Sequence, residues 1–236
     1  DIFATAFAGD DVVWYENNGS QSFTKTVIDA NLTTTYGLDV QDLDSDGDMD
    51  VIAAGRGIND VVWYENDGTE SFTEKTIDAD LDGAGRLVVR DLDEDGDMDV
   101  IVTALDANDV VWYANNGSES FTKSIIDDDL ENARHVVVHD LDDDGDLDVI
   151  ATSSNASGDD LVWYANDGSE NFTASAIAND LSEAFDLEVA DLDGDSDQDV
   201  IVTVFTDNDV LWYANNGSES FTKNTIDNNF SGVAEV

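Results

Sequence analysis

The sequence has 236 residues, a length that suits one large or two small domains. Its 56 acidic and 8 basic residues give a formal net charge of −48. This charge argues against nucleic acid and anionic membrane surfaces as partners, because both require basic patches. The charge instead favours cations, and it suits a salty medium in which self-repulsion is screened. Since 41% of the residues are hydrophobic, the chain can still form a sizeable core.

The chain contains no Cys, so disulfides cannot stabilise it. No apolar run approaches the roughly 18 residues of a membrane span, and we expect no membrane insertion. No signal peptide is present and the first residue is Asp1. We therefore expect a processed chain or a piece excised from a larger one.

The strongest organising signal is internal repetition. Tryptophan recurs at spacings of 49, 49, 51 and 49 residues. Each period has the same order, with small variations: an acidic loop, "DVI", a variable stretch, "DVVWY", a turn such as "NNGS" or "NDGT", "SFTKTVID" and a second variable stretch. The recurring tryptophans are Trp14, Trp63, Trp112, Trp163 and Trp212.

Each repeat predicts four short strands, because β-branched and aromatic runs alternate with turn signals. In the second repeat we expect strands near 38–42, 50–54, 61–65 and 71–77. The "NNGS" stretches, such as 17–20, predict hairpin turns with a positive φ. No stretch keeps a helical period long enough to compete.

The third strand of each repeat carries "VVWY" or a close variant, which is apolar on both faces and must be covered on both. Four-stranded units stacked around an axis satisfy this requirement. We therefore predict an all-β fold, a five-bladed β-propeller of four-stranded antiparallel blades. We expect the C-terminal "GVAEV" to pair with the N-terminal "DIFATAFAG" and close the ring. The single domain spans 1–236, with blades at about 1–31 plus 232–236, 37–80, 86–129, 135–180 and 186–229.

The acidic loop "DLDSDGDMD" has carboxylates at alternate positions. Asp42, Asp44, Asp46 and Asp50 stand at loop positions 1, 3, 5 and 9, with a glycine at position 6. Calcium takes six to eight oxygen ligands, and a tightly turning loop can direct several carboxylates and the position-7 carbonyl at one ion. We expect the apolar residue at position 8 (Met49, Met98 or Leu147) to face the core and anchor the loop. Solvated acidic turns are the alternative interpretation.

The loops "DLDSDGDMDVI", "DLDEDGDMDVI" and "DLDDDGDLDVI" resemble the FG-GAP/VCBS repeats of integrin-α-like propellers, and "DLDGDSDQDVI" matches less well. With no Pro, the chain lacks the Gly-Ala-Pro signature and is more similar to the bacterial VCBS branch. The resemblance implies a calcium under each motif-bearing blade, in a domain that is often extracellular and adhesive or glycan-binding.

We therefore expect up to four Ca²⁺ ions that hold the loops rather than catalyse. The fourth loop should bind most weakly, because Ser196 replaces the position-6 glycine and Gln198 the apolar anchor. The candidate metal residues are Asp42, Asp44, Asp46, Asp48, Asp50, Asp91, Asp93, Asp95, Asp97, Asp99, Asp140, Asp142, Asp144, Asp146, Asp148, Asp191, Asp193, Asp195, Asp197 and Asp199.

Strand direction alternates within a blade, so the acidic loops and Asn-Gly turns should share one rim and the variable connections the other. Arginine and aromatic residues gather on the variable rim, where they suit a sugar, a carboxylate or a peptide. Unconstrained loop drift is the alternative. The candidate ligand-binding residues are Tyr36, Arg56, Arg86, Arg134, His135 and Phe185, and Phe7 and Phe205 fall on the same rim.

No nucleophile–base–orienter set is visible, so we do not expect an enzyme. We predict a secreted or cell-surface, calcium-stabilised binding or adhesion module, monomeric, with a glycan or surface polymer as ligand. The recurring tryptophans could stack sugars, but their mid-strand positions favour space-filling between blades. The alternatives are a purely structural module of a larger surface protein and a polysaccharide lyase or hydrolase.

Overall fold

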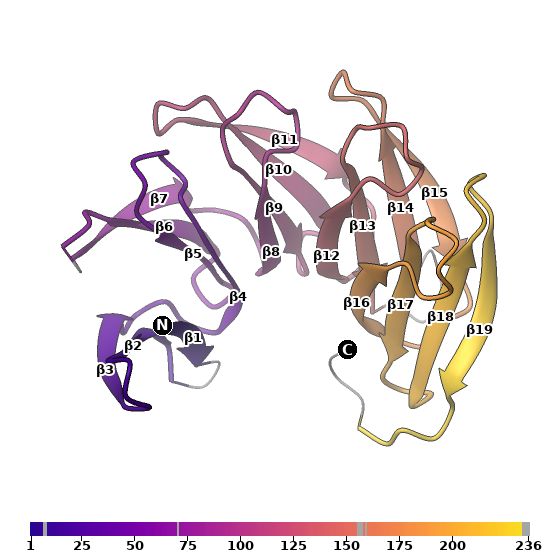
Figure 1. Cartoon of the computed structure of the whole chain (residues 1–236), viewed down its shortest axis with the longest axis horizontal. Helices are drawn as coiled ribbons and strands as arrows, with labels where there is room; N and C mark the ends of the chain where they lie inside the picture. Colours follow the sequence, from indigo (N-terminus) through magenta and orange to yellow (C-terminus); the bar gives the residue numbers. More distant parts are fainter. Residues whose placement is uncertain (7–8, 70, 155–157, 159, 233–236) are drawn as a thin grey trace. The chain divides into compact units, whose positions relative to one another are not determined.

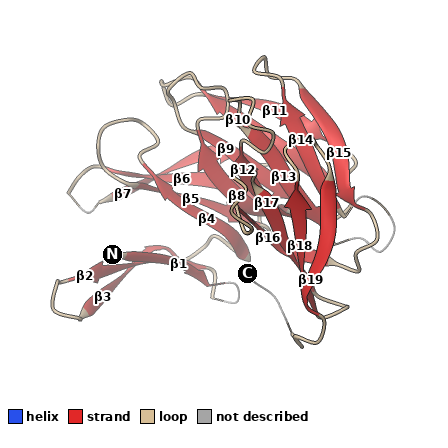
Figure 2. Cartoon of the chain, turned by 45° about the vertical axis from the view of Figure 1, so that its right-hand side comes forward, coloured by secondary structure: helices blue, strands red, loops and turns tan. Residues whose placement is uncertain are grey.

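The computed structural model describes residues 1–6, 9–69, 71–154, 158 and 160–232. The described residues form strands β1 to β19 and no helix (Figure 2). In consequence, this part of the chain offers no helix with the length and apolar character that a membrane crossing requires. The predicted all-β fold is confirmed.

The strands form five antiparallel sheets, here called blades 1 to 5, and in each blade they lie in chain order (Figure 1). Blade 1 has three described strands and the other blades have four. The strands are β1 (Ile2–Ala6), β2 (Asp11–Asn17) and β3 (Phe23–Asp29); β4 (Thr35–Gln41), β5 (Asp50–Gly55), β6 (Asp60–Asn66) and β7 (Phe72–Asp78); β8 (Ala84–Arg90), β9 (Asp99–Ala104), β10 (Asp109–Asn115) and β11 (Phe121–Asp127); β12 (Ala133–His139), β13 (Asp148–Ser153), β14 (Leu161–Asn166) and β15 (Phe172–Ala178); and β16 (Ala184–Ala190), β17 (Asp199–Val204), β18 (Asp209–Asn215) and β19 (Phe221–Asp227).

The predicted strands of the second repeat agree with blade 2, although the first of them begins three residues earlier than expected, at Thr35. The hairpin prediction is also confirmed, since Gly19 has a φ of 74° and Gly117 a φ of 65°. The fourth strand expected for blade 1 falls mainly on residues 233–236, which lie outside the described residues. Closure of the ring therefore stays a prediction.

Burial follows the expected order within each blade. The second strands of blades 2, 3 and 4 are buried at every residue, whereas the outer strand β3 is largely exposed. Trp63, Trp112 and Trp163 are each at most 3% exposed. These tryptophans therefore fill space in the core and do not offer faces to a sugar.

The chain divides into two compact units. One comprises 1–91, 95–107 and 111–124, and the other 92–94, 108–110 and 125–236. In the first unit, β4 lies against β8, and a side chain at Gly37 would collide with the backbone of Gly85 and Leu87. In the second unit, β12 lies against β16. Each unit has its own apolar core.

Within each unit, the connections between strands lie at the two ends of the blades, because neighbouring strands are antiparallel. On the rim opposite the acidic loops, the Gly57 N–H donates to Thr33 O at 2.9 Å, and the Leu105 N–H donates to Gly83 O at 2.9 Å. On the other rim, called the acidic rim, each acidic loop lies beside the Asn-Gly turn of its own blade. There the Asn66 N–H donates to Asp50 Oδ1 at 2.8 Å.

Candidate functional site

Hydrogen bonds from backbone N–H groups to the loop's own carboxylates stabilise the turns of the acidic loops. In the first loop, Asp44 Oδ1 accepts the Asp46 N–H at 3.2 Å, and Asp46 Oδ1 accepts the Asp48 N–H at 2.9 Å. These are successive Asx turns, in which an aspartate bonds the backbone two residues on. The third loop repeats them from Asp142 and Asp144. The alternate spacing of Asp thus shapes the loop as well as supplying oxygens.

The aspartate at position 1 has one carboxylate oxygen in use and one without a partner. Asp42 Oδ2 accepts the Gly47 N–H at 3.0 Å, while Asp42 Oδ1 is buried and has no hydrogen-bond partner among the described residues. The same holds for Oδ1 of Asp91 and of Asp140. A buried carboxylate oxygen without a partner is costly, and a bound cation would remove that cost.

The aspartate at position 9 is fully buried. Asp50 Oδ1 accepts the Asn66 N–H at 2.8 Å, and its Oδ2 accepts the Leu43 N–H at 3.0 Å. Burial nevertheless raises the pKa of Asp50 to about 6, and it does the same for Asp148. Since burial opposes ionisation, a nearby cation would favour the charged form.

Positions 1, 3 and 9 lie together. Asp42, Asp44 and Asp50 each offer an oxygen within 4.8 Å of the others, and so do the matching residues Asp140, Asp142 and Asp148. Burial also raises the pKa of Asp44 and of Asp142. Three carboxylate oxygens, one of them without a partner, are a donor set that suits calcium.

The predicted residues at positions 5 and 7 stand outside these two groups. Asp46 is exposed, and its Oδ1 accepts the Asp48 N–H. The carboxylate of Asp48 lies against Gly68 in the Asn-Gly turn, where a side chain would collide with it. Asp97 and Gly117 repeat this contact. The side chain at position 7 therefore explains the glycine in the turn.

The expected anchor at position 8 is wrong for the first loop. Met49 is 55% exposed, because it precedes the inward-facing Asp50 and consecutive strand residues point to opposite faces. Met98 is partly buried and does pack against the core of the first unit. The anchor is the leucine at position 2, since Leu43 and Leu141 are each 2% exposed.

The fourth loop departs from the others in structure as well as in sequence. Both oxygens of Asp191 accept backbone N–H groups, from Gly194 at 2.7 Å and from Ser196 at 3.1 Å. Ser196 has a φ of 83°, in the region that favours glycine. The position-2 leucine, Leu192, is 45% exposed. The fourth loop therefore lacks both the free position-1 oxygen and the buried anchor.

On the opposite rim of the first unit, the predicted ligand residues already have partners. Arg56 makes a two-pronged contact with Asp106, with Nε–Oδ2 at 2.9 Å and Nη2–Oδ1 at 2.6 Å. The hydrogen bond with Asp106 raises the pKa of Arg56, and a hydrogen bond with Tyr36 acts in the same direction. The backbone oxygen of Arg86 accepts the Thr103 hydroxyl at 3.2 Å. The sequence did not indicate Asp106 as the partner of Arg56.

On the opposite rim of the second unit, the predicted residues come together. The Arg134 guanidinium lies over the Phe185 ring at 3.7 Å, and the rings of Phe185 and Phe205 are 5.8 Å apart. His135 Nδ1 accepts the Leu187 N–H at 3.1 Å and lies 3.1 Å from Asp186 Oδ1. Phe7, the other aromatic residue that the sequence predicts for the variable connections, lies outside the described residues.

A family model for the FG-GAP-like repeat matches the chain four times, over residues 1–53, 42–102, 91–151 and 140–202. Each match after the first begins at the first aspartate of an acidic loop. None of the curated proteins compared with the chain matches it in sequence.

Several solved structures have a similar fold. An Agrocybe aegerita lectin that recognises non-reducing terminal N-acetylglucosamine is 18% identical with a TM-score of 0.53, over 95% of this chain and 76% of that one. Virginiamycin B lyase from Staphylococcus aureus is 16% identical with a TM-score of 0.59, over 85% and 58%. The V. cholerae biofilm matrix protein Bap1 is 16% identical with a TM-score of 0.57, over 99% and 40%. At these identities the likeness shows the fold alone.

Proposed function

Because the chain belongs to the FG-GAP-like repeat family, we propose that it is a secreted, calcium-stabilised binding module whose ligand is a glycan. In this proposal the five blades form one closed, monomeric propeller domain over 1–236, with residues 232–236 paired to β1. The acidic rim holds the metal, and the opposite rim holds the ligand.

The calcium part of the proposal is supported by the buried free oxygens of Asp42, Asp91 and Asp140. In the first loop, the carboxylates of Asp42, Asp44, Asp46 and Asp50 and the carbonyl of Asp48 would hold the ion, and the other loops would use the matching residues. Burial opposes the ionisation of these carboxylates, and the positive charge of the ion would favour their charged form. Its role is therefore to hold the loop between the first two strands of a blade.

One observation carries the glycan part of the proposal: the stacked Arg134 and Phe185 beside Phe205. Aromatic faces and planar guanidinium groups suit the mixed apolar and hydroxyl surface of a sugar ring. This patch is unusual in a chain with a net charge of −48. Arg56 is a weaker candidate, because Asp106 already occupies its guanidinium.

A glycan array tests this assignment. We expect calcium-loaded protein to bind a restricted set of glycans, and Arg134→Ala and Phe185→Ala to reduce that binding by tenfold or more. Lys223→Ala is the matched control, because Lys223 lies on β19, the outer strand of blade 5, where it bonds Asp180. If Lys223→Ala loses as much glycan binding as Arg134→Ala does, the assignment of the ligand site to Arg134 and Phe185 is wrong.

The array also separates the alternatives. A silent array with correctly folded protein would favour a structural module of a larger surface protein. Cleavage of an acidic polysaccharide would establish an enzyme.

Ring closure has its own test, amide hydrogen exchange in β1. We expect slow exchange of β1 amides in the whole chain and fast exchange in a chain that ends at residue 231. Equal exchange rates in the two chains would contradict pairing of 232–236 with β1.

A further inference from the structure

The first strands of blades 4 and 5 each contain a β-bulge, in which two residues stand opposite one residue of the second strand. In β12 the two residues are Arg134 and His135, and in β16 they are Phe185 and Asp186. A bulge redirects its side chains and is common beside active sites. The stacked pair proposed for ligand binding, Arg134 and Phe185, therefore consists of one residue from each bulge.

Two buried threonines of the second strands hold the backbone of the bulges. The Thr152 hydroxyl accepts the His135 N–H at 3.1 Å and donates to Phe185 O at 3.4 Å, so it joins β12 to β16. The Thr203 hydroxyl accepts the Asp186 N–H at 3.1 Å. Both threonines are 0% exposed. The backbone on each side of the stacked pair is therefore fixed by hydrogen bonds to a buried hydroxyl.

The His135 side chain makes a further contact between the two bulges. Its Nδ1 atom accepts the Leu187 N–H at 3.1 Å and also lies 3.1 Å from Asp186 Oδ1. Both Leu187 and Asp186 are buried. A ring nitrogen offers one lone pair when it is unprotonated and one N–H when it is protonated. Nδ1 can therefore bond the Leu187 N–H or the Asp186 carboxylate, but not both.

The charge of the imidazole selects between these two partners. The neutral ring accepts the Leu187 N–H, as in this structure. A ring protonated at Nδ1 would donate to Asp186 and leave the buried Leu187 N–H without this acceptor. Because an unpaired buried N–H is costly, protonation of His135 requires β16 to shift next to Phe185. Histidine ordinarily changes charge between about pH 5 and pH 8.

The strands around His135 carry few other charges. β12 packs against β13 and β16. Besides His135, the charged or titratable residues on these three strands are Arg134, His139, Asp148, Asp186 and Glu188. His139 and Asp148 pair at the other end of blade 4, and Glu188 is exposed. Of the three carboxylates, Asp186 lies within ion-pair distance of Nδ1.

We propose that His135 positions the stack of Arg134 on Phe185 and that its protonation weakens ligand binding. The neutral ring keeps Leu187, and with it the bulge that carries Phe185, beside β12. The protonated ring draws Asp186 toward itself and releases Leu187, which moves Phe185 relative to Arg134. Ligand binding at this site, which rests on the proposed function, is therefore strong at neutral pH and weak in acid.

Nuclear magnetic resonance of the calcium-loaded protein without ligand tests the positioning role. The ring current of Phe185 shifts the Arg134 Nε–H resonance, and Phe185→Leu identifies that shift by removing it. We expect a fall from about pH 8 to about pH 5 to reduce the Arg134 shift and to move the Leu187 amide resonance together with the His135 ring resonances. An Arg134 shift that is the same at both pH values would overturn the proposal.

Three variants isolate the proton of His135. His135→Asn is the matched control, because its amide oxygen can accept the Leu187 N–H but gains no proton in this range, so the Arg134 shift should stay constant. His139→Asn, at the other end of β12, should keep the pH dependence. Asp186→Asn should move the change to lower pH, because an opposite charge favours the protonated ring. A pH dependence that persists in His135→Asn, or disappears in His139→Asn, would overturn the proposal.

The glycan array at the same two pH values separates this role from the proposed function. We expect binding to be about tenfold or more weaker at the lower pH in the unsubstituted protein, and equal at both pH values in His135→Asn. Equal binding at both pH values in the unsubstituted protein would overturn the role of His135 and leave the proposed ligand site standing. A silent array, with an Arg134 resonance that responds to His135, would overturn the glycan assignment and leave the positioning role standing.

Discussion

The Tyr164 hydroxyl donates a hydrogen bond of 2.7 Å to Asp127 Oδ2, and this bond joins β14 of blade 4 to β11, the outer strand of blade 3. In the first unit, Tyr64 and Tyr113 make the same bond to Asp29 and Asp78. The series stops at Tyr213, whose buried hydroxyl has no partner among the described residues. At the phase of the aspartate stands Ala178.

Because the series is interrupted at Tyr213, the same Tyr→Phe change should have different effects on stability at two positions. Tyr164→Phe should lower the free energy of unfolding by about 1.5 kcal/mol, because it removes a bond to a carboxylate. Tyr213→Phe should be neutral or stabilising, because it removes a buried hydroxyl without a partner. Urea denaturation at fixed calcium measures both. Equal losses in the two variants would contradict this account.

Removal of calcium should destabilise the protein. At a free calcium concentration about 100-fold above Kd, each site would add about 2.7 kcal/mol to the free energy of unfolding. We expect a chelator to lower the thermal midpoint strongly, and added calcium to restore it. The control is sodium chloride at matched ionic strength, which screens the charge of −48 without filling the loops. Full recovery with sodium chloride alone would show that screening, not binding, is responsible.

The four loops should differ in affinity. The loop that begins at Asp191 should empty first in a chelator titration, since both oxygens of Asp191 are already bonded and Ser196 adopts a positive φ. Asp42→Asn should therefore remove a tight site, and Asp191→Asn a weak one. Calorimetric titration of each variant counts the sites lost. Four equivalent sites, or a tightest site at Asp191, would show that the reasoning is wrong.

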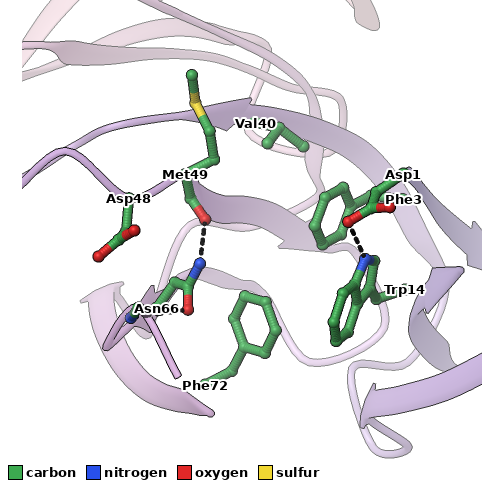
Figure 3. A pocket seen from close by; sticks show the side chains of 9 residues that line it. Asp1, Phe3, Trp14, Val40, Asp48, Met49, Asn66 and Phe72 are labelled. Atoms are coloured by element: carbon green, nitrogen blue, oxygen red, sulfur yellow. Dashed lines mark hydrogen bonds between the residues drawn. The ribbon is translucent and has the colours of Figure 1, made fainter. Parts of the chain in front are cut away.

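The hydrogen bond from Asn115 Nδ2 to Leu43 O, 3.1 Å long, predicts a difference between two equivalent asparagines. Asn115→Ala should cost about 1 to 2 kcal/mol more than Asn66→Ala in the free energy of unfolding. Both substitutions remove the turn bond and the bond to the methionine carbonyl, which Figure 3 shows between Asn66 and Met49, but only Asn115 also bonds Leu43 O. Thermal or urea denaturation gives the comparison. An equal cost would mean that the bond to Leu43 contributes no net stability.

Sequence pattern predicted those features that depend on neighbours along the chain. Alternating aspartates and a glycine at position 6 predicted the turning of the loop, and the observed Asx bonds link residues two apart. The prediction that Met49 faces the core is wrong, since its side chain is 55% exposed. Whether position 2 or position 8 meets the core depends on the pleat of β5 and on the blade beside it.

For the opposite rim, the sequence indicated which residues gather there but not how they pair. Arg56 and Arg134 were equivalent candidates, yet Asp106 binds one and Phe185 stacks on the other. The repeat pattern does not predict either pairing, because the loops that carry these residues vary in length and composition from blade to blade.

The sequence by itself determined the number of repeats, the strand order, the turns and the acidic loops, because β-propensity, positive φ and Asx turns act within a few residues. Only the tertiary structure decided the bond between Leu43 and Asn115 and the Tyr–Asp bonds between blades. Leu43 and Asn115 are 72 positions apart, and Tyr64 and Asp29 are 35 apart. Such partners meet through the stacking of whole blades, which local preference does not specify.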